Sequence, residues 1–204
     1  VNIESLGYEG EGVARIDGIP VFIPGALINE QVKIKINKVK KNFAFGKLIE
    51  VLQESEERRK SECNNFKKCG GCTLQHLTYN GQLDFKYNRV KDCIRKIAGL
   101  DENIVKYPIG MNNEFRYRNK VQFPVGLVNG KVAIGFFSEK THEIIDMDTC
   151  ILQDEESEKV VRYIRSWINT YNIIPARKDG KFYSKGLLRH IVIRKSFKTN
   201  DIMV

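Results

Sequence analysis

Short apolar runs separated by turn residues characterise the front of the chain. Residues 13–16 and 19–23 are two such runs, and an Asp-Gly pair lies between them. Asp-Gly in this position is a strong hairpin signal. Residues 32–36 alternate between apolar and basic side chains, as a half-buried strand does, and residues 43–52 supply a further run. The pattern predicts an all-β barrel of about five strands, the size of an OB fold.

Further along, apolar residues recur every three or four positions and predict two helices. The stripe of the first helix comprises Leu83, Tyr87, Val90, Ile94 and Ile97. Gly99 follows it, where a C-terminal cap belongs. The second helix begins near Asp154, and Glu155 and Glu156 suit the positive end of its dipole. The stripe of this second helix comprises Val160, Val161, Ile164, Trp167, Ile168 and Tyr171.

A charged segment divides these two kinds of pattern. Residues 54–60 are almost entirely charged and are interpreted as a solvated linker. Beyond it, alternation predicts strands at residues 115–125, 132–137, 144–145 and 187–195, with an Asn-Gly turn after the first. Strands and helices are therefore mixed in this part of the chain. We predict an all-β OB-like barrel at residues 1–56, followed by an α+β domain at residues 57–204.

The charge balance favours a polyanionic partner. The chain has 34 Lys and Arg against 25 Asp and Glu, a net charge of +9. The excess is segmental, because residues 159–204 carry eleven basic and two acidic side chains, as expected of a surface that faces phosphate. No apolar stretch approaches the roughly 20 residues that cross a membrane, and no signal peptide opens the chain. These features predict a cytoplasmic protein without a membrane partner, and they indicate no protein partner.

Four of the five cysteines form a pattern that suits a metal centre. Three follow the spacing C-x5-C-x2-C, and a fourth lies far downstream. A four-iron cubane has its irons at the corners of a tetrahedron, so one loop reaches three of them and a distant segment supplies the fourth ligand. Two glycines between the second and third cysteines would let the backbone curl around such a cluster. The ligands would be Cys63, Cys69, Cys72 and Cys150.

Zinc is the main alternative for this site. Structural zinc sites usually use two short pairs of ligands, whereas one spacing here is longer and Cys150 has no cysteine or histidine close to it in sequence. A disulfide framework is disfavoured because nothing marks the chain as secreted, and five unrelated thiols would leave the motif to chance. Cys93 is interpreted as a small core residue on the first helix. His76 is interpreted as a hydrogen-bonded structural residue.

The cysteine block also carries a family resemblance. Residues 63–77 read CNNFKKCGGCTLQHL and residues 148–153 read DTCILQ. Together they resemble the iron–sulfur signature of the bacterial RNA uracil-5-methyltransferases, and above all of the branch that modifies 23S ribosomal RNA. The front of the chain resembles a TRAM domain, a small RNA-binding barrel, through GEGVAR at residues 10–15, VFIPG at residues 21–25 and EQVK at residues 30–33. Two further segments resemble the central domain of the family, namely FRYRNKVQF at residues 115–123 and LRHIVIR at residues 188–194.

The resemblance implies a 4Fe–4S cluster on Cys63, Cys69, Cys72 and Cys150, and RNA, ribosomal in this branch, as the partner. Family members use S-adenosylmethionine to methylate C5 of a uridine, through a C-terminal domain with a catalytic Cys, a general base and the cofactor site. Val1 in place of Met, and a last strand without a terminator, lead us to expect a piece of a longer protein. We therefore assign no catalytic or cofactor-binding residue and expect residues 1–204 alone to be inactive. The alternative is a non-catalytic RNA-binding module with a structural metal site, zinc or iron–sulfur.

One candidate RNA-binding surface lies on the strand predicted at residues 115–125. Alternation places Arg116, Arg118 and Lys120 on the face opposite its apolar side chains. A row of three cations on one strand approximates the reach needed to follow a phosphate backbone. An ordinary solvated strand face is the alternative interpretation.

Two further groups of cations are candidates. Residues 32–47 hold six lysines and no acid, and include Lys38, Lys40 and Lys41. Phe43 and Phe45 are interleaved with them; cations with aromatics suit single-stranded RNA, although we interpret both rings as part of the core. The other group consists of Arg189 and Arg194, from a strand that carries charges on both faces.

Overall fold

The computed structural model has two compact units, and the chain passes between them more than once. Residues 1–61 and 73–110 form unit 1, and residues 62–72 and 111–204 form unit 2. The structure describes residues 1–204 except 140, 142, 177, 180–181 and 184–185. The division differs from the boundary predicted after residue 56, because residues 73–110 group with the barrel and only residues 62–72 of the intervening segment group with the second unit.

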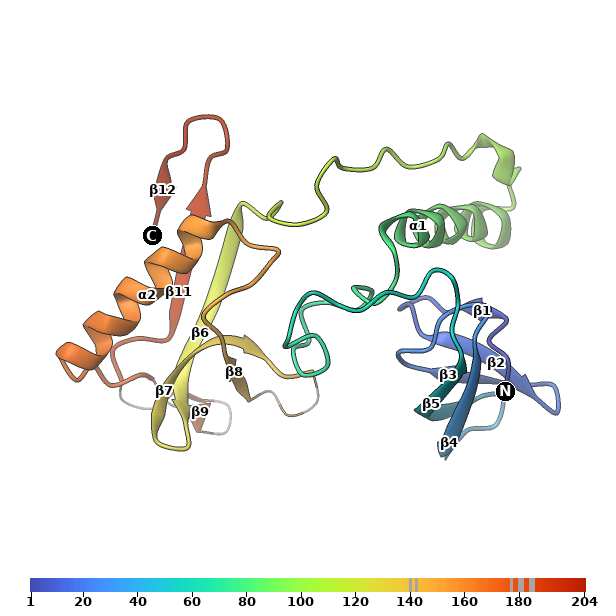
Figure 1. Ribbon diagram of the computed structural model, residues 1–204, viewed down its shortest axis with the longest axis horizontal. Coiled ribbons are helices and arrows are strands. Elements are labelled where there is room, and N and C mark those ends of the chain that lie inside the picture. Colours follow the sequence, from blue (N-terminus) through green and yellow to red (C-terminus); the bar gives the residue numbers. More distant parts are fainter. Residues whose placement is uncertain (140, 142, 177, 180–181, 184–185) are drawn as a thin grey trace. The chain divides into compact units, whose positions relative to one another are not determined.

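Unit 1 is built on a five-stranded sheet with the order β1-β2-β3-β5-β4 (Figure 1). Its strands are β1 (Ser5–Leu6), β2 (Gly12–Ile16), β3 (Ile19–Ile23), β4 (Gln31–Val39) and β5 (Ala44–Gln53). The amide of Ile3 donates to the carbonyl of Glu30 at 2.9 Å, and Asn2 pairs with Gln31, so the N-terminal segment joins β4 as well. The sheet therefore closes on itself as a small barrel, as the apolar runs predict.

The predicted hairpin between β2 and β3 is confirmed. The two strands pair antiparallel, and the turn residues Asp17 and Gly18 have φ angles of 49° and 79°. Positive φ at both positions is the geometry of a type I′ turn, which suits the twist of the flanking strands. The side chains that point into the barrel are small and branched, and its core comprises Ile3, Ala14, Val21, Ile23, Ala26, Val32 and Ala44.

The charged segment after the barrel is not a solvated linker. The Arg58 guanidinium donates to both carboxylate oxygens of Glu30, whose side chain is fully buried. Arg58 also donates to the carbonyl of Gly25 at 2.7 Å. Burial alone would raise the pKa of Glu30, but the hydrogen bonds from Arg58 and from the amide of Leu27 outweigh burial and lower it. The ion pair therefore fixes this segment to the barrel, and this part of the sequence-based interpretation is wrong.

Helix α1 (Tyr79–Cys93) completes unit 1 and continues into a π-helical turn, η1 (Ile94–Ala98), and a 3-10 turn, η2 (Glu102–Ile104). Gly99 ends η1 with a φ of 66°, which confirms the predicted cap. The predicted apolar stripe is not a buried one, because Val90 and Ile97 are 49% and 82% exposed. The side chain of Arg89 packs over the ring of Tyr8, 3.5 Å from its centroid. Among the described residues of α1 only Gly81 is buried, so a polar–aromatic contact such as that of Arg89 matters more for this helix than an apolar core.

Unit 2 contains a second five-stranded sheet, antiparallel throughout, with the order β12-β11-β6-β7-β8. Helix α2 (Glu155–Thr170) accompanies this sheet (Figure 1). The strands are β6 (Lys120–Val128), β7 (Lys131–Phe137), β8 (Ile144–Asp146), β11 (His190–Lys195) and β12 (Ile202–Met203), and a separate pair is formed by β9 (Lys178–Asp179) and β10 (Phe182–Tyr183). The Asn-Gly turn between β6 and β7 and the start of α2 after Asp154 are confirmed.

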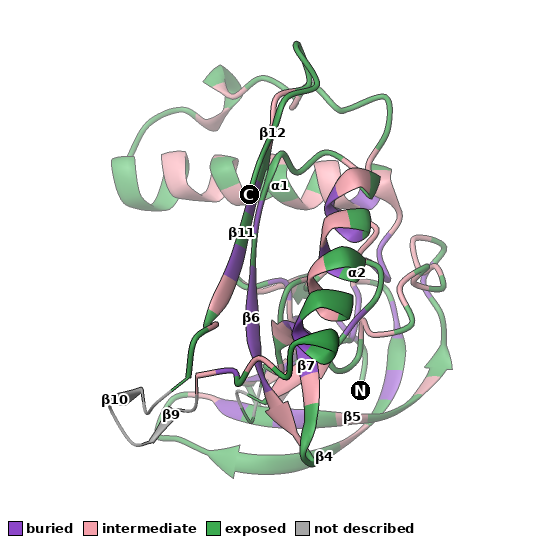
Figure 2. Ribbon diagram, turned by 90° about the vertical axis from the view of Figure 1, so that its left-hand side faces the viewer, coloured by how far each residue is buried: buried purple, intermediate pink, exposed green. Residues whose placement is uncertain are grey.

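The core of unit 2 lies between α2 and the sheet. Strand β6 is buried over most of its length and α2 on one face only (Figure 2). The cluster comprises Val121, Phe123, Val125, Ile134, Val161, Ile168, Ile191 and Ile193. Trp167 and Tyr171, expected in the stripe of α2, are 42% and 66% exposed. Within the described residues, no helix is both long and apolar enough to cross a membrane.

Candidate functional site

The four cysteines of the predicted metal centre belong to one unit. Cys63, Cys69 and Cys72 lie in the segment of residues 62–72, and Cys150 lies between β8 and α2, so all four are part of unit 2. Each is partly buried. Cys93 is the last residue of α1, in unit 1. The fold thus separates the fifth cysteine from the other four, as the sequence motif does.

The cysteine segment is fixed to the end of β7 by its own backbone. Cys69 forms a bridge with Ser138, and the amide of Gly70 donates to the carbonyl of Phe137 at 3.2 Å. A Cβ on Gly70 would lie 3.1 Å from the Cα of Glu139, so a side chain here would push the two segments apart. This glycine is needed for close approach, since its φ is not positive.

The second glycine lies against a cysteine sulfur. The amide of Gly71 donates to Sγ of Cys69 at 3.4 Å, and a Cβ on Gly71 would come within 3.3 Å of that sulfur. An amide directed at a sulfur stabilises the thiolate form, which is the form that ligates a metal. The use of the glycine pair around a cluster stays a prediction.

The fourth cysteine is held by a charged pair that the sequence did not predict. The guanidinium of Arg116 donates to the carbonyls of Cys150 and Gln153 at 3.1 and 2.9 Å, and to the carboxylate of Glu158. Glu158 in turn accepts the amide of Cys150 at 3.2 Å. Both polar groups of the Cys150 backbone are therefore bound by one ion pair. Glu158 is 8% exposed, so Arg116 supplies the counter-charge to a largely buried carboxylate.

Two of the predicted partner cysteines act electrostatically on the thiol of Cys150. Burial raises the pKa of the Cys150 thiol, and the charges of Cys63 and Cys69 add to that rise. Nevertheless, within the part of the chain that is described, no three His, Cys, Asp or Glu side chains converge closely enough to hold a single metal ion. A tetrahedral zinc site needs thiolates about 3.8 Å apart, given Zn–S bonds of about 2.3 Å. The thiols of Cys63 and Cys69 thus act on that of Cys150, but the described residues do not converge on one ion.

The row of three cations predicted on residues 115–125 is not formed. Strand β6 begins only at Lys120, and Arg116 has a φ of 57°, which breaks the alternation. The amides of Arg116 and Arg118 instead donate to the carbonyls of Ile151 and Leu152, at 2.8 and 3.0 Å. Arg118 and Lys120 are exposed, whereas Arg116 is used inside unit 2. The sequence-based face is therefore corrected to two exposed cations.

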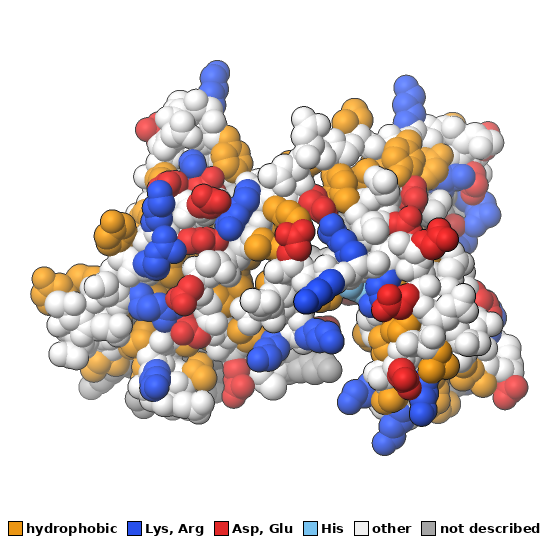
Figure 3. Space-filling model, viewed as in Figure 1, with side chains coloured by type: hydrophobic (Ala, Val, Ile, Leu, Met, Phe, Trp, Pro, Cys, Tyr) orange, Lys and Arg blue, Asp and Glu red, His pale blue; other side chains and the backbone are white. Residues whose placement is uncertain are grey.

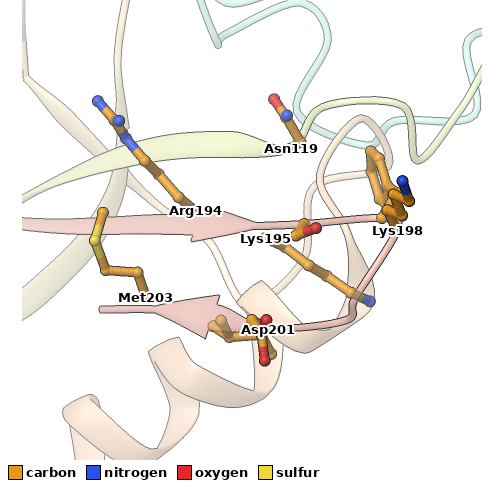
Figure 4. A pocket seen from close by; sticks show the side chains of 9 residues that line it. Asn119, Arg194, Lys195, Lys198, Asp201 and Met203 are labelled. Atoms are coloured by element: carbon orange, nitrogen blue, oxygen red, sulfur yellow. The ribbon is translucent and has the colours of Figure 1, made fainter.

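The cations of β11 and its neighbourhood point in different directions. Arg194 and Lys195 leave the strand on opposite sides, beside an open hollow that also includes Asn119, Lys198 and Met203 (Figure 4). Lys195 forms an ion pair with Asp154 at 2.8 Å, whereas Arg194 is exposed. Arg189 is exposed and lines a different hollow of unit 2. The charges of this strand therefore do not act as one surface, because Lys195 is bound to Asp154.

The barrel lysines remain on the surface. Lys38, Lys40 and Lys41 are exposed, and their ammonium groups have no ion-pair partner among the described residues. Figure 3 shows Lys and Arg side chains beside hydrophobic ones along the lower edge of this unit.

The phenylalanines next to these lysines are not in the core. Phe45 is 40% exposed and Phe43 is partly exposed, whereas Ala44 and Gly46 between and after them are buried. A Cβ on Gly46 would lie 3.2 to 3.3 Å from Val21, Ile23 and Ile34, so this face of β5 packs tightly inward. The interpretation of both rings as core is therefore wrong. The sequence itself contained evidence for the exposed position of the rings. Small residues alternate with them, which indicates that the small residues face the crowded core.

His76 lies in unit 1, whereas the four cysteines lie in unit 2. Its side chain is 7% exposed. Burial lowers the pKa of His76 to about 4, and the positive charge of Arg58 acts in the same direction. The residue is thus neutral in the fold at pH 7, which agrees with a structural role.

Comparison with known domain families identifies the barrel. Residues 1–49 match the TRAM domain. The match covers the five strands almost entirely and confirms the TRAM resemblance of the front of the chain.

Relatives cover the whole chain. An uncharacterized RNA methyltransferase of Clostridium acetobutylicum is 45% identical over 206 residues, which is 100% of this chain and 44% of that protein. One from Staphylococcus epidermidis is 45% identical over 200 residues, 98% of this chain and 43% of that protein. The chain therefore spans less than half the length of these curated relatives.

A solved structure shares the fold. The crystal structure of Pyrococcus abyssi tRNA (uracil-54, C5)-methyltransferase in complex with S-adenosyl-L-homocysteine superimposes with a TM-score of 0.71 and 25% sequence identity. The match covers 98% of this chain and 44% of that one. The barrel unit and the sheet unit thus occur together in an enzyme of that name.

Proposed function

We propose that this chain is the RNA-binding and iron–sulfur part of an S-adenosylmethionine-dependent methyltransferase that methylates C5 of a uridine in RNA. The observation that carries the proposal is the fold that it shares, over 98% of its length, with an enzyme named for that reaction. The names of the curated relatives support the same class of activity. Because the chain spans less than half of these proteins, the activity is proposed for a longer protein that contains it.

In this proposal the methyl donor binds outside residues 1–204, and the catalytic groups also lie outside them. Among the described strands, only β3 and β5 pair parallel, whereas nucleotide-type cofactors usually bind to sheets of parallel βαβ units. Residues 1–204 alone should therefore neither bind S-adenosylmethionine nor methylate RNA. Calorimetric titration of this chain with S-adenosylmethionine is the test. Saturable binding would place the chemistry within the chain and contradict this division.

We further propose that Cys63, Cys69, Cys72 and Cys150 hold a 4Fe–4S cluster. The donor set consists of thiols alone, the four share one unit, and a backbone amide is directed at one of the sulfurs. The thiols of Cys63 and Cys69 act electrostatically on that of Cys150, and thiolates alone are the usual ligands of such clusters. The cluster would tie the cysteine segment to the Cys150 loop as a structural cross-link.

Metal analysis of protein prepared without oxygen tests this assignment. Iron and sulfide in near-equal amounts, with broad visible absorption, are expected. Cys150→Ser should lose the iron, and the matched variant Cys93→Ser should keep it, because Cys93 lies on α1 in the other unit. Zinc without iron, or equal behaviour of the two variants, would overturn the ligand assignment.

The RNA target separates two versions of the activity. We propose 23S ribosomal RNA in the cytoplasm, on the resemblance of the cysteine signature, whereas the solved relative is named for a tRNA uracil. The complete protein should be incubated with S-adenosylmethionine and either RNA, and 5-methyluridine measured by mass spectrometry of the nucleosides. Product in ribosomal RNA alone supports this target, and product in tRNA alone contradicts it. No product in either would leave a non-catalytic RNA-binding module as the better description.

The proposed RNA contacts are the exposed cations of both units. Lys38, Lys40 and Lys41 belong to the barrel, and Arg118, Lys120, Arg189 and Arg194 belong to unit 2. Arg116 leaves this set because its guanidinium is used on the Cys150 loop. Such contacts to phosphate give affinity without sequence preference.

A further inference from the structure

Three phenylalanine rings form a cluster on the outer face of the barrel. The centroids of Phe43 and Phe45 lie 5.4 Å apart, those of Phe22 and Phe43 lie 5.8 Å apart, and those of Phe22 and Phe45 lie 6.1 Å apart. All three are at least partly exposed, Phe45 most of all. The rings come from β3, from β5 and from the residue before β5. The cluster is thus held by two neighbouring strands and is preformed.

The rings point outward because the opposite face of the same strands is full. Val21 and Ile23 flank Phe22 along β3 and are buried. A Cβ on Gly46, next to Phe45, would lie only 3.2 to 3.3 Å from three inward-facing side chains. Alternation then leaves the rings on the outer face, where their area is not needed for the core of the barrel. Aromatic side chains exposed together on a small domain are unusual and indicate a binding surface.

Positive charge surrounds the rings. Lys38 lies directly opposite Phe45 in the register of β4 and β5, and in the same pairing Lys35 lies opposite Lys47. Residues that are directly opposite share a face of the sheet, so these ammonium groups and the rings face the same way. The turn that follows β4 adds Lys40 and Lys41, whose side chains are exposed.

From this arrangement we infer that the face formed by Phe22, Phe43 and Phe45 binds an unpaired stretch of RNA and stacks a base on Phe45. The inference rests on the proposed RNA-binding function and narrows it to single strands. In a duplex the faces of the bases are covered by their neighbours, so a ring can stack on a base only where the strand is unpaired. The surrounding lysines supply the complementary charge for the phosphates.

A fluorescent RNA tests the inference directly. The probe is a 12-nucleotide single-stranded RNA with one 2-aminopurine, whose emission falls when the base stacks, and its duplex with the complement is the comparison. The complete chain should bind the single strand with loss of emission and bind the duplex more weakly. Phe45→Leu should weaken single-strand binding about ten-fold, as for loss of one stacked base, with the salt dependence unchanged.

Two variants control for folding and for general apolar contact. Phe45→Tyr keeps the ring and should keep both the affinity and the loss of emission. Ile49→Ala removes an exposed aliphatic side chain from the same strand, 51% exposed, and should change neither. Circular dichroism and thermal unfolding of each variant should match the parent, because the altered side chains lie outside the core.

The outcomes distinguish this inference from the function on which it rests. Salt-sensitive RNA binding that Phe45→Leu leaves intact would overturn the stacking face and keep the RNA-binding proposal. Absence of RNA binding by the parent would overturn both. Three further results would overturn the inference, because each would assign the face to another kind of contact. The first is an equal loss of RNA affinity in Phe45→Leu and Ile49→Ala, and the second is an equal loss of affinity for the single strand and the duplex. The third is an oligomer of the parent that Phe45→Leu dissociates.

Discussion

Two of the three basic groups predicted to contact RNA have different electrostatic surroundings in the folded chain. In residues 33–41 of the barrel, the lysines stand on the surface without carboxylate partners among the described residues. In residues 116–120, the first cation is bound to a carboxylate and two carbonyls of a loop more than thirty residues away. Arg58, in the segment expected to be a solvated linker, is likewise bound to a carboxylate, that of Glu30. Of these cations, the barrel lysines are left for a partner, whereas Arg58 and Arg116 each use several donors to fasten a segment.

Removing Arg58 should have the largest effect. Arg58→Met keeps the apolar stem but leaves the fully buried carboxylate of Glu30 without its partner, at a cost of about 3–5 kcal/mol in the free energy of unfolding. Denaturant unfolding of the parent and the variant measures it. The double variant Arg58→Met, Glu30→Leu should recover much of the loss, because no charge is then buried.

An exposed pair provides the control for this result. Arg95 and Asp92, on the surface of unit 1, are 56% and 48% exposed, and Arg95→Met should cost less than about 1 kcal/mol. Equal losses of unfolding free energy for Arg58→Met and Arg95→Met would mean that the Arg58–Glu30 pair does not stabilise the barrel.

His76 adds a pH dependence to the same region. Its pKa is about 4 in the fold, below the ordinary value of 6.5, because it is buried and near Arg58. The unfolded chain therefore binds the proton more readily, so the stabilisation is complete above pH 6.5 and is lost as the pH falls towards 4. The free energy of unfolding should fall by roughly 2–3 kcal/mol over this pH range.

The measurement is the difference between the parent and His76→Gln across this pH range. His190 in unit 2 also has its pKa lowered, by burial and by Arg189, so the parent profile alone is not specific. Glu30, whose pKa is lowered as well, acts below this window. Identical pH profiles for the parent and His76→Gln would contradict a buried neutral imidazole.

Arg116 should behave as a fastening and not as an RNA contact. Arg116→Met removes the ion pair of Glu158 and a donor to two carbonyls, and should destabilise unit 2 by about 1.5–3 kcal/mol. At temperatures where the variant is folded, the dependence of RNA affinity on salt should match the parent. A salt slope flatter by about 0.7 would return Arg116 to the RNA-binding set.

The exposed lysines should show the reverse behaviour, with the smallest effect on stability. The triple variant Lys38→Ala, Lys40→Ala, Lys41→Ala should flatten the slope of log K against log salt by about 2 for single-stranded RNA, at about 0.7 for each phosphate contact. Stability should change little, because these ammonium groups have no partner within the described residues. The double variant Arg118→Ala, Lys120→Ala should flatten the slope by about 1.4 if both contact phosphate. Unchanged slopes in both variants would make the two surfaces ordinary solvated faces.

Local signals predicted the fold well where the local pattern decides it. The Asp-Gly hairpin, the Asn-Gly turn, the cap at Gly99 and the start of α2 all depend on a few neighbouring residues, and all are found. The cysteine spacing likewise separated Cys93 from the four cysteines of unit 2.

Long-range pairing decided the features that the sequence did not predict. Whether Arg116 continues a strand depends on Glu158 and on the carbonyl of Cys150, which no pattern around residue 116 reveals. The same holds for Arg58 and Glu30, 28 residues apart. The outward position of Phe45 was open to prediction, because Ala44 and Gly46 beside it are the residues that a crowded interior requires.

The interleaving of the two units has a consequence for synthesis on the ribosome. All of unit 1 has been made once residue 110 is added, whereas unit 2 then possesses only its cysteine segment. Cys150 is added 78 residues after Cys72, which at roughly 5–20 residues per second takes about 4–16 s. During that interval the first three thiols exist without the β-sheet that their segment joins and without the fourth cysteine. Unit 1 is therefore complete and able to fold before unit 2, while three of the four proposed ligands are present without the fourth.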